Sequence, residues 1–318
     1  MRPVFLVSAA LAAESENGAR EDANRLRRMD RFGRTGFLAG TRAFAASGAV
    51  RPAGPDARGG VIVGTQHGCR PAITEHAARL AAAARVEDLA PSVFAATVHN
   101  SVNGELAMAL GLGGVSEAIV SGRTAGLEAL ILGARRVASS DADRVLVVAA
   151  EGVDDAMREA WAEERSALGP RAAGVELVET GAAVLLEAGE ISSNKRFPAR
   201  YVSGTLFFEP DARRAAARFS GWVKDVEARA GGEASPEAAV TLCAPDYEDF
   251  LEGEEGDAPR IERFGAAGLY EIALEVAARR AQAAVEPLSP SPSRRIHLYL
   301  TRDITGAVAA VALQSDSS

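Results

Sequence analysis

The 318-residue sequence contains little cysteine and little histidine, which restricts the chemistry that the chain can perform. Its two cysteines are Cys69 and Cys243, and its four histidines are His67, His76, His99 and His297. Two cysteines so far apart form no disulfide framework, so we expect a reducing compartment. The pair His67 and Cys69 suggests a metal ligand set or a nucleophile, but no further ligand or third catalytic group stands at a suitable spacing. We therefore expect a structural loop at this pair, no metal site and no cofactor.

The sequence also has no excess of positive charge and no long hydrophobic run. Its 35 Lys and Arg residues are outnumbered by 43 Asp and Glu, giving a net charge of −8, which argues against a nucleic-acid-binding surface. No stretch is long and apolar enough to span a bilayer. The apolar run 3–13 follows only Arg2 and has no convincing cleavage region, so it predicts a first strand rather than a signal peptide. We predict a cytoplasmic globular protein without a membrane partner.

Strand-like and helix-like segments alternate along the chain. Short apolar segments predict strands at 4–8, 61–63, 117–120, 144–151, 180–188, 201–208, 239–243, 296–301 and 307–314. Helical spacing or alanine-rich composition predicts helices at 29–46, 75–85, 91–110, 124–137, 154–167 and 265–284. The pattern recurs in shorter form after a polar break at 191–194. We therefore predict a layered α/β fold with two pseudo-duplicated halves, residues 1–190 and 191–318.

Residues 116–130 form the stretch around which the chain is organised. A short strand over 117–120 turns abruptly at Ser121 and Gly122 into a buried helix over 124–137. The free N–H groups and dipole of such a helix N-terminus activate a thiol and stabilise an oxyanion. The residue at this elbow, however, is Arg123, which can neither deprotonate nor attack a carbonyl. The sequence therefore has the position of a nucleophile without the nucleophile.

Several stretches resemble, in the same order, a β-ketoacyl synthase of the thiolase fold. Residues 30–37 are similar to the early helix of that family, and 60–65 to its second strand and glycine loop. Asn100 with residues 104–114 resembles its interface helix and the following turn. Residues 121–129 resemble the nucleophile elbow, which in active members reads Thr-Ala-Cys-x-Ser-Gly-Leu, and 146–151 and 179–187 resemble the next strands. The resemblance is good over 29–188, and it implies a five-layered αβαβα fold.

The chain departs from this family where active members carry their cysteine and two histidines. Arg123 occupies the position of the cysteine. The segments expected to hold the two histidines are 244–250 and the region near 264–268, and neither contains histidine. The glycine-rich turn between the last two strands is replaced at 303–306. This pattern resembles a chain-length factor, the non-catalytic partner of a ketosynthase in type II polyketide synthases. The short second half of the chain resembles the factors of the highly reducing, polyene-making branch.

The resemblance implies a catalytic ketosynthase subunit as heterodimer partner and an acyl carrier protein that delivers the substrate. It places residues 94–108 along a shared acyl tunnel at the interface, where side-chain bulk would limit the length of the growing chain. The candidate tunnel and interface residues are Phe94, Val98, His99, Asn100, Val102, Asn103, Met108 and Arg123. An ordinary core helix is the alternative for this stretch, and a hydrogen-bonded interface residue is favoured over a catalytic base for His99.

Arg123 has two possible roles at this stage. It could fill the vacated pocket and hydrogen-bond carbonyls or a carboxylate across the dimer, which would block acyl entry on this side, or it could be tolerated because no chemistry is selected there. A buried arginine is costly unless its guanidinium is paired, so we expect a partner for it. For the whole chain, a degenerate decarboxylase or hydrolase is disfavoured because the histidine pair is missing. A homodimeric ketosynthase-like scaffold or acyl-binding protein without condensing activity stays open as an alternative.

Overall fold

The computed structural model describes residues 1–13, 22–85, 91–168, 176–189, 199–229, 239–242, 261–262, 266–285, 294–302, 305 and 307–316. The strands are β1 (Val4–Ala13), β2 (Gly59–Thr65), β3 (Ser116–Val120), β4 (Arg144–Glu151), β5 (Glu176–Leu177), β6 (Thr180–Ala188), β7 (Ala199–Phe208), β8 (Ala239–Leu242), β9 (Ile261–Glu262), β10 (Arg294–Arg302) and β11 (Ala307–Asp316). The helices are α1 (Ala23–Leu26), α2 (Arg31–Ala46), α3 (Arg70–Ala82), α4 (Pro91–Ala95), α5 (Ser101–Leu110), α6 (Ala125–Ala138), α7 (Asp155–Leu168), α8 (Ala212–Arg229) and α9 (Ala267–Val285). No helix within these ranges combines the length and apolarity needed to cross a membrane.

Nine strands form one mixed sheet in the order β3-β2-β4-β6-β1-β7-β11-β10-β8. In its first part, β3, β2 and β4 are parallel, whereas β6 is antiparallel to both β4 and β1. The two parts of the sheet meet where β1 pairs with β7 over only three residues, Val4 with Tyr201, Phe5 with Arg200 and Leu6 with Ala199.

The second part of the sheet repeats the connectivity of the first. β8 is parallel to β10 as β2 is to β4, β10 is antiparallel to β11 as β4 is to β6, and β11 is antiparallel to β7 as β6 is to β1. Within the described ranges, the second part has no counterpart of β3 in the nine-stranded sheet. This repeat of strand order and direction confirms the predicted pseudo-duplication. The boundary predicted at residue 190 falls in a segment outside the described residues and stays a prediction.

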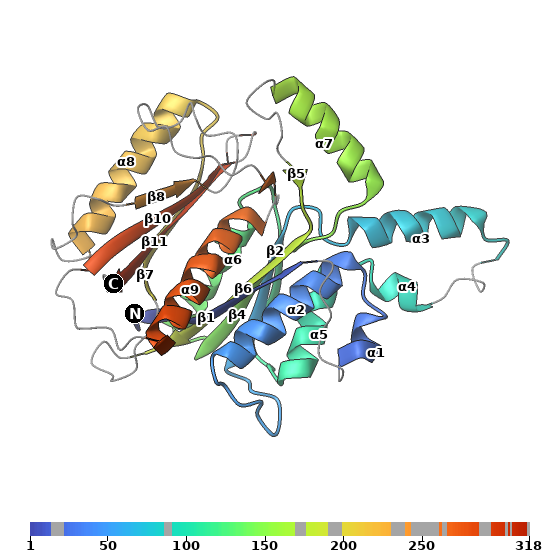
Figure 1. Ribbon diagram of the computed structural model, residues 1–318, viewed down its shortest axis with the longest axis horizontal. Coiled ribbons are helices and arrows are strands. Elements are labelled where there is room, and N and C mark those ends of the chain that lie inside the picture. The colour runs from blue at the N-terminus through green and yellow to red at the C-terminus, as the bar shows by residue number, and fades with distance from the viewer. Residues whose placement is uncertain are drawn as a thin grey trace.

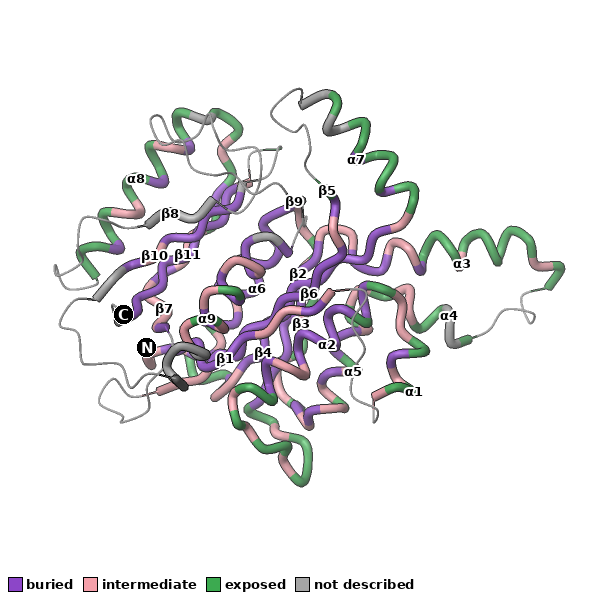
Figure 2. The backbone as a smooth tube through the Cα atoms, in the orientation of Figure 1, coloured by how far each residue is buried: buried purple, intermediate pink, exposed green. Residues whose placement is uncertain are grey.

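The elements stack in five layers, helix–sheet–helix–sheet–helix (Figure 1). α6 and α9 form the central layer between the two parts of the sheet, and one hydrophobic cluster surrounds them. α2 and α5 cover the outer face of the first part with a second cluster, and α8 covers the outer face of the second part with a third. Figure 2 shows the buried residues concentrated in this stack, whereas α3 and α7 extend away from it and are largely exposed. The predicted αβαβα architecture is therefore confirmed.

Local sequence explains why β4 and α2 form in the first half of the chain. β4 is almost entirely apolar because it is covered on both faces, by α2 on one side and α6 on the other. α2 begins at Asp30, whose carboxylate accepts a hydrogen bond of 2.7 Å from the backbone N–H of Gly33. Burial raises the pKa of Asp30 to about 6, although this hydrogen bond acts in the opposite direction.

The structure departs from the predicted elements in several places. The single helix expected over 91–110 is two helices, because α4 ends at Ala95 and α5 begins only at Ser101. The Thr97 hydroxyl donates a 2.8 Å hydrogen bond to the carbonyl of Phe94, and such side-chain bonds compete with helix propagation. The first strand continues past residue 8 to Ala13 because it pairs with β6 over its whole length. α8 was not predicted, although its buried side chains have helical spacing.

Candidate functional site

The candidate site lies at one edge of the first part of the sheet, where the three parallel strands β2, β3 and β4 end. They end at Thr65, Val120 and Glu151 respectively. The carboxyl ends of adjacent parallel strands form the usual location of functional residues in open α/β sheets. The predicted strand–turn–helix elbow is at this edge, with β3 ending at Val120 and α6 beginning at Ala125.

Close packing and a side-chain clamp hold the elbow. A Cβ at Gly64 would lie 2.4 Å from the carbonyl oxygen of Ala125, so only glycine allows the helix start to approach β2 this closely. Glu128, in the first turn of α6, accepts hydrogen bonds from the hydroxyls of Ser121 (3.0 Å) and Thr124 (2.5 Å). The turn that presents residue 123 is therefore tied to the helix it precedes.

Arg123 is buried at the elbow, with 2% of its surface exposed. The carbon at the centre of its guanidinium lies 5.9 Å from the centroid of the Trp161 ring, a cation–π distance that links the elbow to α7. A positive charge is unfavourable at a helix N-terminus, so Trp161 supplies a compensating interaction at this position. Both sequence hypotheses for the role of Arg123 stay predictions, because this contact lies within one chain.

A buried carboxylate, Glu151, lies at the same edge of the sheet, at the end of β4. It accepts hydrogen bonds from the Thr65 hydroxyl (3.0 Å) and from the backbone N–H groups of Gln66, His67 (3.0 Å) and Gly68 (3.3 Å). Burial raises the pKa of Glu151 to about 7, and the four hydrogen bonds counteract part of that rise. Glu151 therefore ties the glycine-bounded loop after β2 to the end of β4.

His67 and Cys69 lie in this loop and lack the properties of catalytic groups. Burial lowers the pKa of His67 to about 4, and the charges of Arg70 and Arg123 lower it further. His67 is therefore neutral at pH 7, and its 3.8 Å approach to Glu151 is not an ion pair there. Burial raises the pKa of Cys69 to about 11, which suppresses the thiolate that a nucleophile needs. Within the described ranges, no cluster of three or more His, Cys, Asp or Glu side chains could hold a metal ion.

A second feature is a pocket of about 500 Å³ between the start of α2 and the α4–α5 region. Three predicted tunnel residues line it, Asn100, Val102 and Met108. Met108 is 56% exposed, whereas Val102 is buried and also packs against the Gly36 position of α2. Asp30 and Gly104 contribute to the same lining. This volume lies within the range of small-molecule sites.

The other predicted tunnel residues lie outside the lining of this pocket. Phe94 and Val98 are exposed, at 61% and 41%, and the Phe94 ring lies 5.8 Å from that of His76. His99 packs against Gly68, where an added Cβ would lie 2.6 Å from the imidazole. Asn103 is buried and donates hydrogen bonds to the carbonyls of Val61 (3.2 Å) and Glu117 (2.7 Å). Asn103 thus bridges two strands instead of facing a pocket.

Sequence reasoning did not identify Glu151 and Trp161. Glu151 ends a predicted buried strand beside the elbow, and a charged residue at that place is a signal that could have been used. Trp161 lies in a predicted helix, and no local pattern connects it with Arg123. The segments expected to carry the missing histidines and the replaced turn, 244–250, 264–265, 303–304 and 306, lie outside the described residues.

Comparison with known proteins finds solved structures with the same fold. The solved structures similar to this chain include the ishigamide ketosynthase/chain length factor, with 20% identity, a TM-score of 0.73, and coverage of 99% of this chain and 100% of that chain. They also include a type II polyketide synthase acyl-carrier protein in complex with its ketosynthase bound to the hexaketide, with 15% identity, a TM-score of 0.71, and coverage of 99% of both chains. A beta-ketoacyl synthase from Burkholderia phymatum STM815 has 12% identity, a TM-score of 0.69, and coverage of 100% of both chains.

These likenesses show a shared ketosynthase fold. No curated protein matches the sequence. The family model described as "Beta-ketoacyl synthase, N-terminal domain" matches residues 12–190, more than half of the chain. By this match, the chain belongs to the β-ketoacyl synthase family.

Proposed function

We propose that the protein is a non-catalytic chain-length factor of a type II polyketide synthase. The observation that carries this proposal is Arg123, buried at the elbow where active members place their nucleophile. An arginine there cannot form an acyl-enzyme. Cys69, the cysteine in the described part of the chain, has a raised pKa and lies on a different loop. The chain then acts by completing the site of a catalytic ketosynthase, to which an acyl carrier protein delivers the substrate.

The surface around β3 supports such a heterodimer. β3 pairs with β2 on one side, and its other edge has no strand partner in the described part of the chain. Val120, on β3 itself, is 51% exposed, and Phe94 and Val98 in the α4–α5 region are 61% and 41% exposed. An open strand edge and exposed apolar side chains favour pairing with another subunit. In this proposal the partner is a catalytic ketosynthase.

The pocket beside α5 supports the second part of the proposal, control of chain length. Met108 and Gly104 lie on α5 and line the pocket, so bulk added there reduces the space for an acyl chain. A Cβ at Gly104 would meet no atom within 4 Å, so a larger side chain there extends into open space. We assign the product to the highly reducing, polyene-making branch, on the sequence resemblance alone.

The test is co-expression with a candidate ketosynthase, followed by native mass determination and product analysis. We expect a one-to-one complex that extends acyl chains only when both subunits are present. Met108→Trp and Gly104→Leu should shorten the product while leaving the complex intact. Leu274→Trp, a matched change at an apolar side chain of α9 that is 48% exposed, should leave product length unchanged. Equal product lengths in all variants would refute length control by this pocket.

A homodimeric scaffold or acyl-binding protein is the alternative function. One observation favours it, because the pocket beside α5 is lined within this chain alone and needs no partner to exist. Native mass separates the two functions. A stable homodimer that binds a medium-chain fatty acid and forms no complex with a ketosynthase would support the alternative and contradict the heterodimer.

A further inference from the structure

A second, larger pocket lies at the opposite end of α6 from the elbow. Its volume is about 650 Å³, and α6, β7, the start of β1 and the end of α8 all contribute to it. α6 has 14 residues, so this pocket lies about 20 Å from Arg123 at a rise of about 1.5 Å per residue. It is therefore separate from both the elbow and the pocket beside α5.

The lining of this pocket is strongly basic although the protein as a whole is acidic. It includes five arginines, Arg2, Arg135, Arg136, Arg200 and Arg229, and a single carboxylate, Asp141. The net charge of the chain is −8, so this concentration of positive charge is a local feature. A recess lined by one sign of charge concentrates ligands of the opposite sign.

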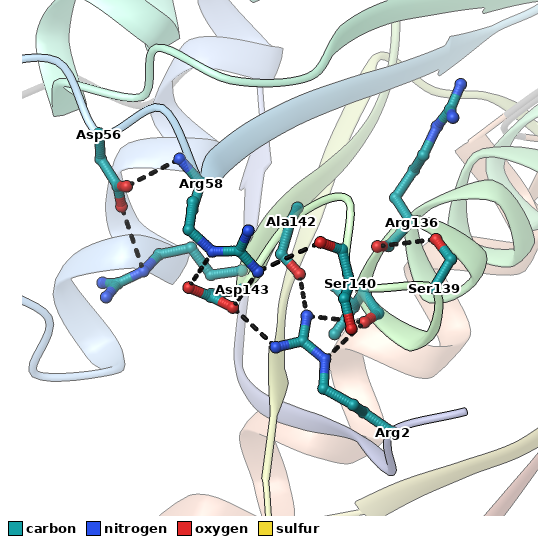
Figure 3. A network of polar contacts seen from close by, with 10 residues as sticks. Arg2, Asp56, Arg58, Arg136, Ser139, Ser140, Ala142 and Asp143 are labelled. Atoms are coloured by element: carbon teal, nitrogen blue, oxygen red, sulfur yellow. Dashed lines mark hydrogen bonds and ion pairs between the residues drawn. The ribbon is translucent and has the colours of Figure 1, made fainter.

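Two of these arginines already have ionic partners that fix them in place. Arg2 donates hydrogen bonds to Asp143 (2.7 Å) and to the carbonyl oxygens of Val137 and Ala142, and Arg58 also binds Asp143 (Figure 3). Arg136 forms ion pairs with Glu117 (2.6 Å) and Asp141 (3.3 Å). This network holds the start of β1 and the α6–β4 turn as a rigid wall of the pocket.

The other three arginines come from three different elements, Arg135 from α6, Arg200 from β7 and Arg229 from α8. Within the ranges that the structure describes, none of the three has a carboxylate within ion-pair distance. The Nε atom of Arg200 is buried and has no hydrogen-bond acceptor among those residues. A buried guanidinium donor without an acceptor is unfavourable unless a ligand supplies one.

Tyr201 lines the same pocket as these arginines. Burial raises the pKa of its phenol well above the usual range, while the charges of Arg135 and Arg229 act in the opposite direction. Both guanidiniums line the same pocket as the phenol, one from α6 and the other from α8. The Tyr201 hydroxyl lies over Gly204, where an added Cβ would come within 2.5 Å of it. Tyr201 thus contributes a neutral phenol ring to the wall of the pocket.

We propose that this pocket binds a small molecule that carries a phosphate group. Guanidinium forks match the geometry of phosphate oxygens and form charge-assisted hydrogen bonds with them. A bound phosphate would accept from Arg135, Arg200 and Arg229. The volume suits a ligand of metabolite size. The ligand is either inorganic phosphate or a phosphate ester, which share this chemistry.

The proposal is tested by calorimetric titration of the full-length chain, alone or in its complex, at constant ionic strength set with chloride. The probes are inorganic phosphate and glycerol 3-phosphate. We expect saturable one-to-one binding of at least one probe. Tighter binding of glycerol 3-phosphate identifies an ester as the ligand class, and tighter binding of inorganic phosphate identifies the free anion.

Variants locate the binding. The double variant Arg135→Gln/Arg229→Gln changes two exposed side chains, so folding should be retained, and it should weaken binding at least tenfold. Arg200→Lys keeps the charge but removes the fork, and it should weaken binding several-fold. Arg213→Gln, an exposed arginine on α8 outside the pocket, should bind like the unchanged protein. The proposal would be overturned if neither probe bound saturably, or if all variants bound with the same affinity.

Discussion

Replacement of Glu151 by glutamine tests the buried carboxylate beside the elbow. Glu151 is fully buried, and its pKa is raised to about 7 from an ordinary value of 4.5. Glutamine has nearly the same shape and does not titrate. Any difference between the two proteins that changes with pH therefore reports the charge at this position.

The direction and size of the effect follow from the pKa shift. For a carboxyl whose pKa is raised on folding, the folded state binds the proton more tightly than the unfolded state. Its contribution to stability is complete below pH 4.5 and is lost as the pH rises through about 7. At about 1.4 kcal/mol per pH unit, the loss is about 3 kcal/mol. His67, whose pKa is lowered to about 4, has the opposite dependence and is present in both proteins.

The measurement is urea unfolding of both proteins at intervals between pH 4.5 and pH 8. We expect the free energy of unfolding of Glu151→Gln, relative to the unchanged protein, to rise by about 3 kcal/mol across this range. Glu187→Gln, at a partly exposed carboxylate on β6, serves as the control for loss of one carboxyl group outside the buried site. A difference that stays constant with pH would refute the buried, titrating carboxylate.

Three further predictions concern the elbow and its supports. Gly64→Ala should lower the free energy of unfolding, measured with urea, by about 2–3 kcal/mol, because the new methyl group meets the start of α6. Gly221→Ala, at a helical position with open space around it, is the control and should raise the free energy of unfolding by about 0.5–1 kcal/mol. Asn103→Ala should lower it by about 1–3 kcal/mol because the carbonyls of Val61 and Glu117 lose their donor, and an unchanged urea midpoint would contradict this. Arg123→Met should raise the pKa of His67 from about 4 toward 6.5, which an NMR titration of the imidazole measures, and an unmoved pKa would place Arg123 elsewhere.

The parts of the fold that depend on local sequence could be predicted from it. The sequence predicted β4 and the strand–turn–helix around Arg123. Burial on two faces gives a continuous apolar run, and an abrupt turn gives a Ser-Gly pair between a strand and a helix. The break between α4 and α5 was not predicted, because the apolar pattern of 91–110 continues across it; in the structure the Thr97 hydroxyl donates to the carbonyl of Phe94 there. α8 could have been predicted, because its buried Ala215, Phe219 and Val226 follow helical spacing.

The candidate site was only partly predictable, because its contacts join distant segments. Glu151 binds the loop after Thr65, which is more than 80 residues earlier in the chain. Asn103 was expected at a tunnel or interface, but its amide reaches the carbonyls of two neighbouring strands. Such pairings follow from strand order, which the sequence pattern did not specify.

The position of β1 within the sheet affects how the protein is made. β1 pairs along its whole length with β6, so Val4 meets its partner only when Ala188 is present. At about 5–20 residues per second, synthesis of the intervening chain of roughly 180 residues takes about 9–36 seconds. During that time β1, with Phe5, Leu6 and Val7, cannot form its sheet pairing. We infer that this apolar strand needs shielding on the ribosome, and that translation stalled before residue 188 would leave an aggregation-prone nascent chain.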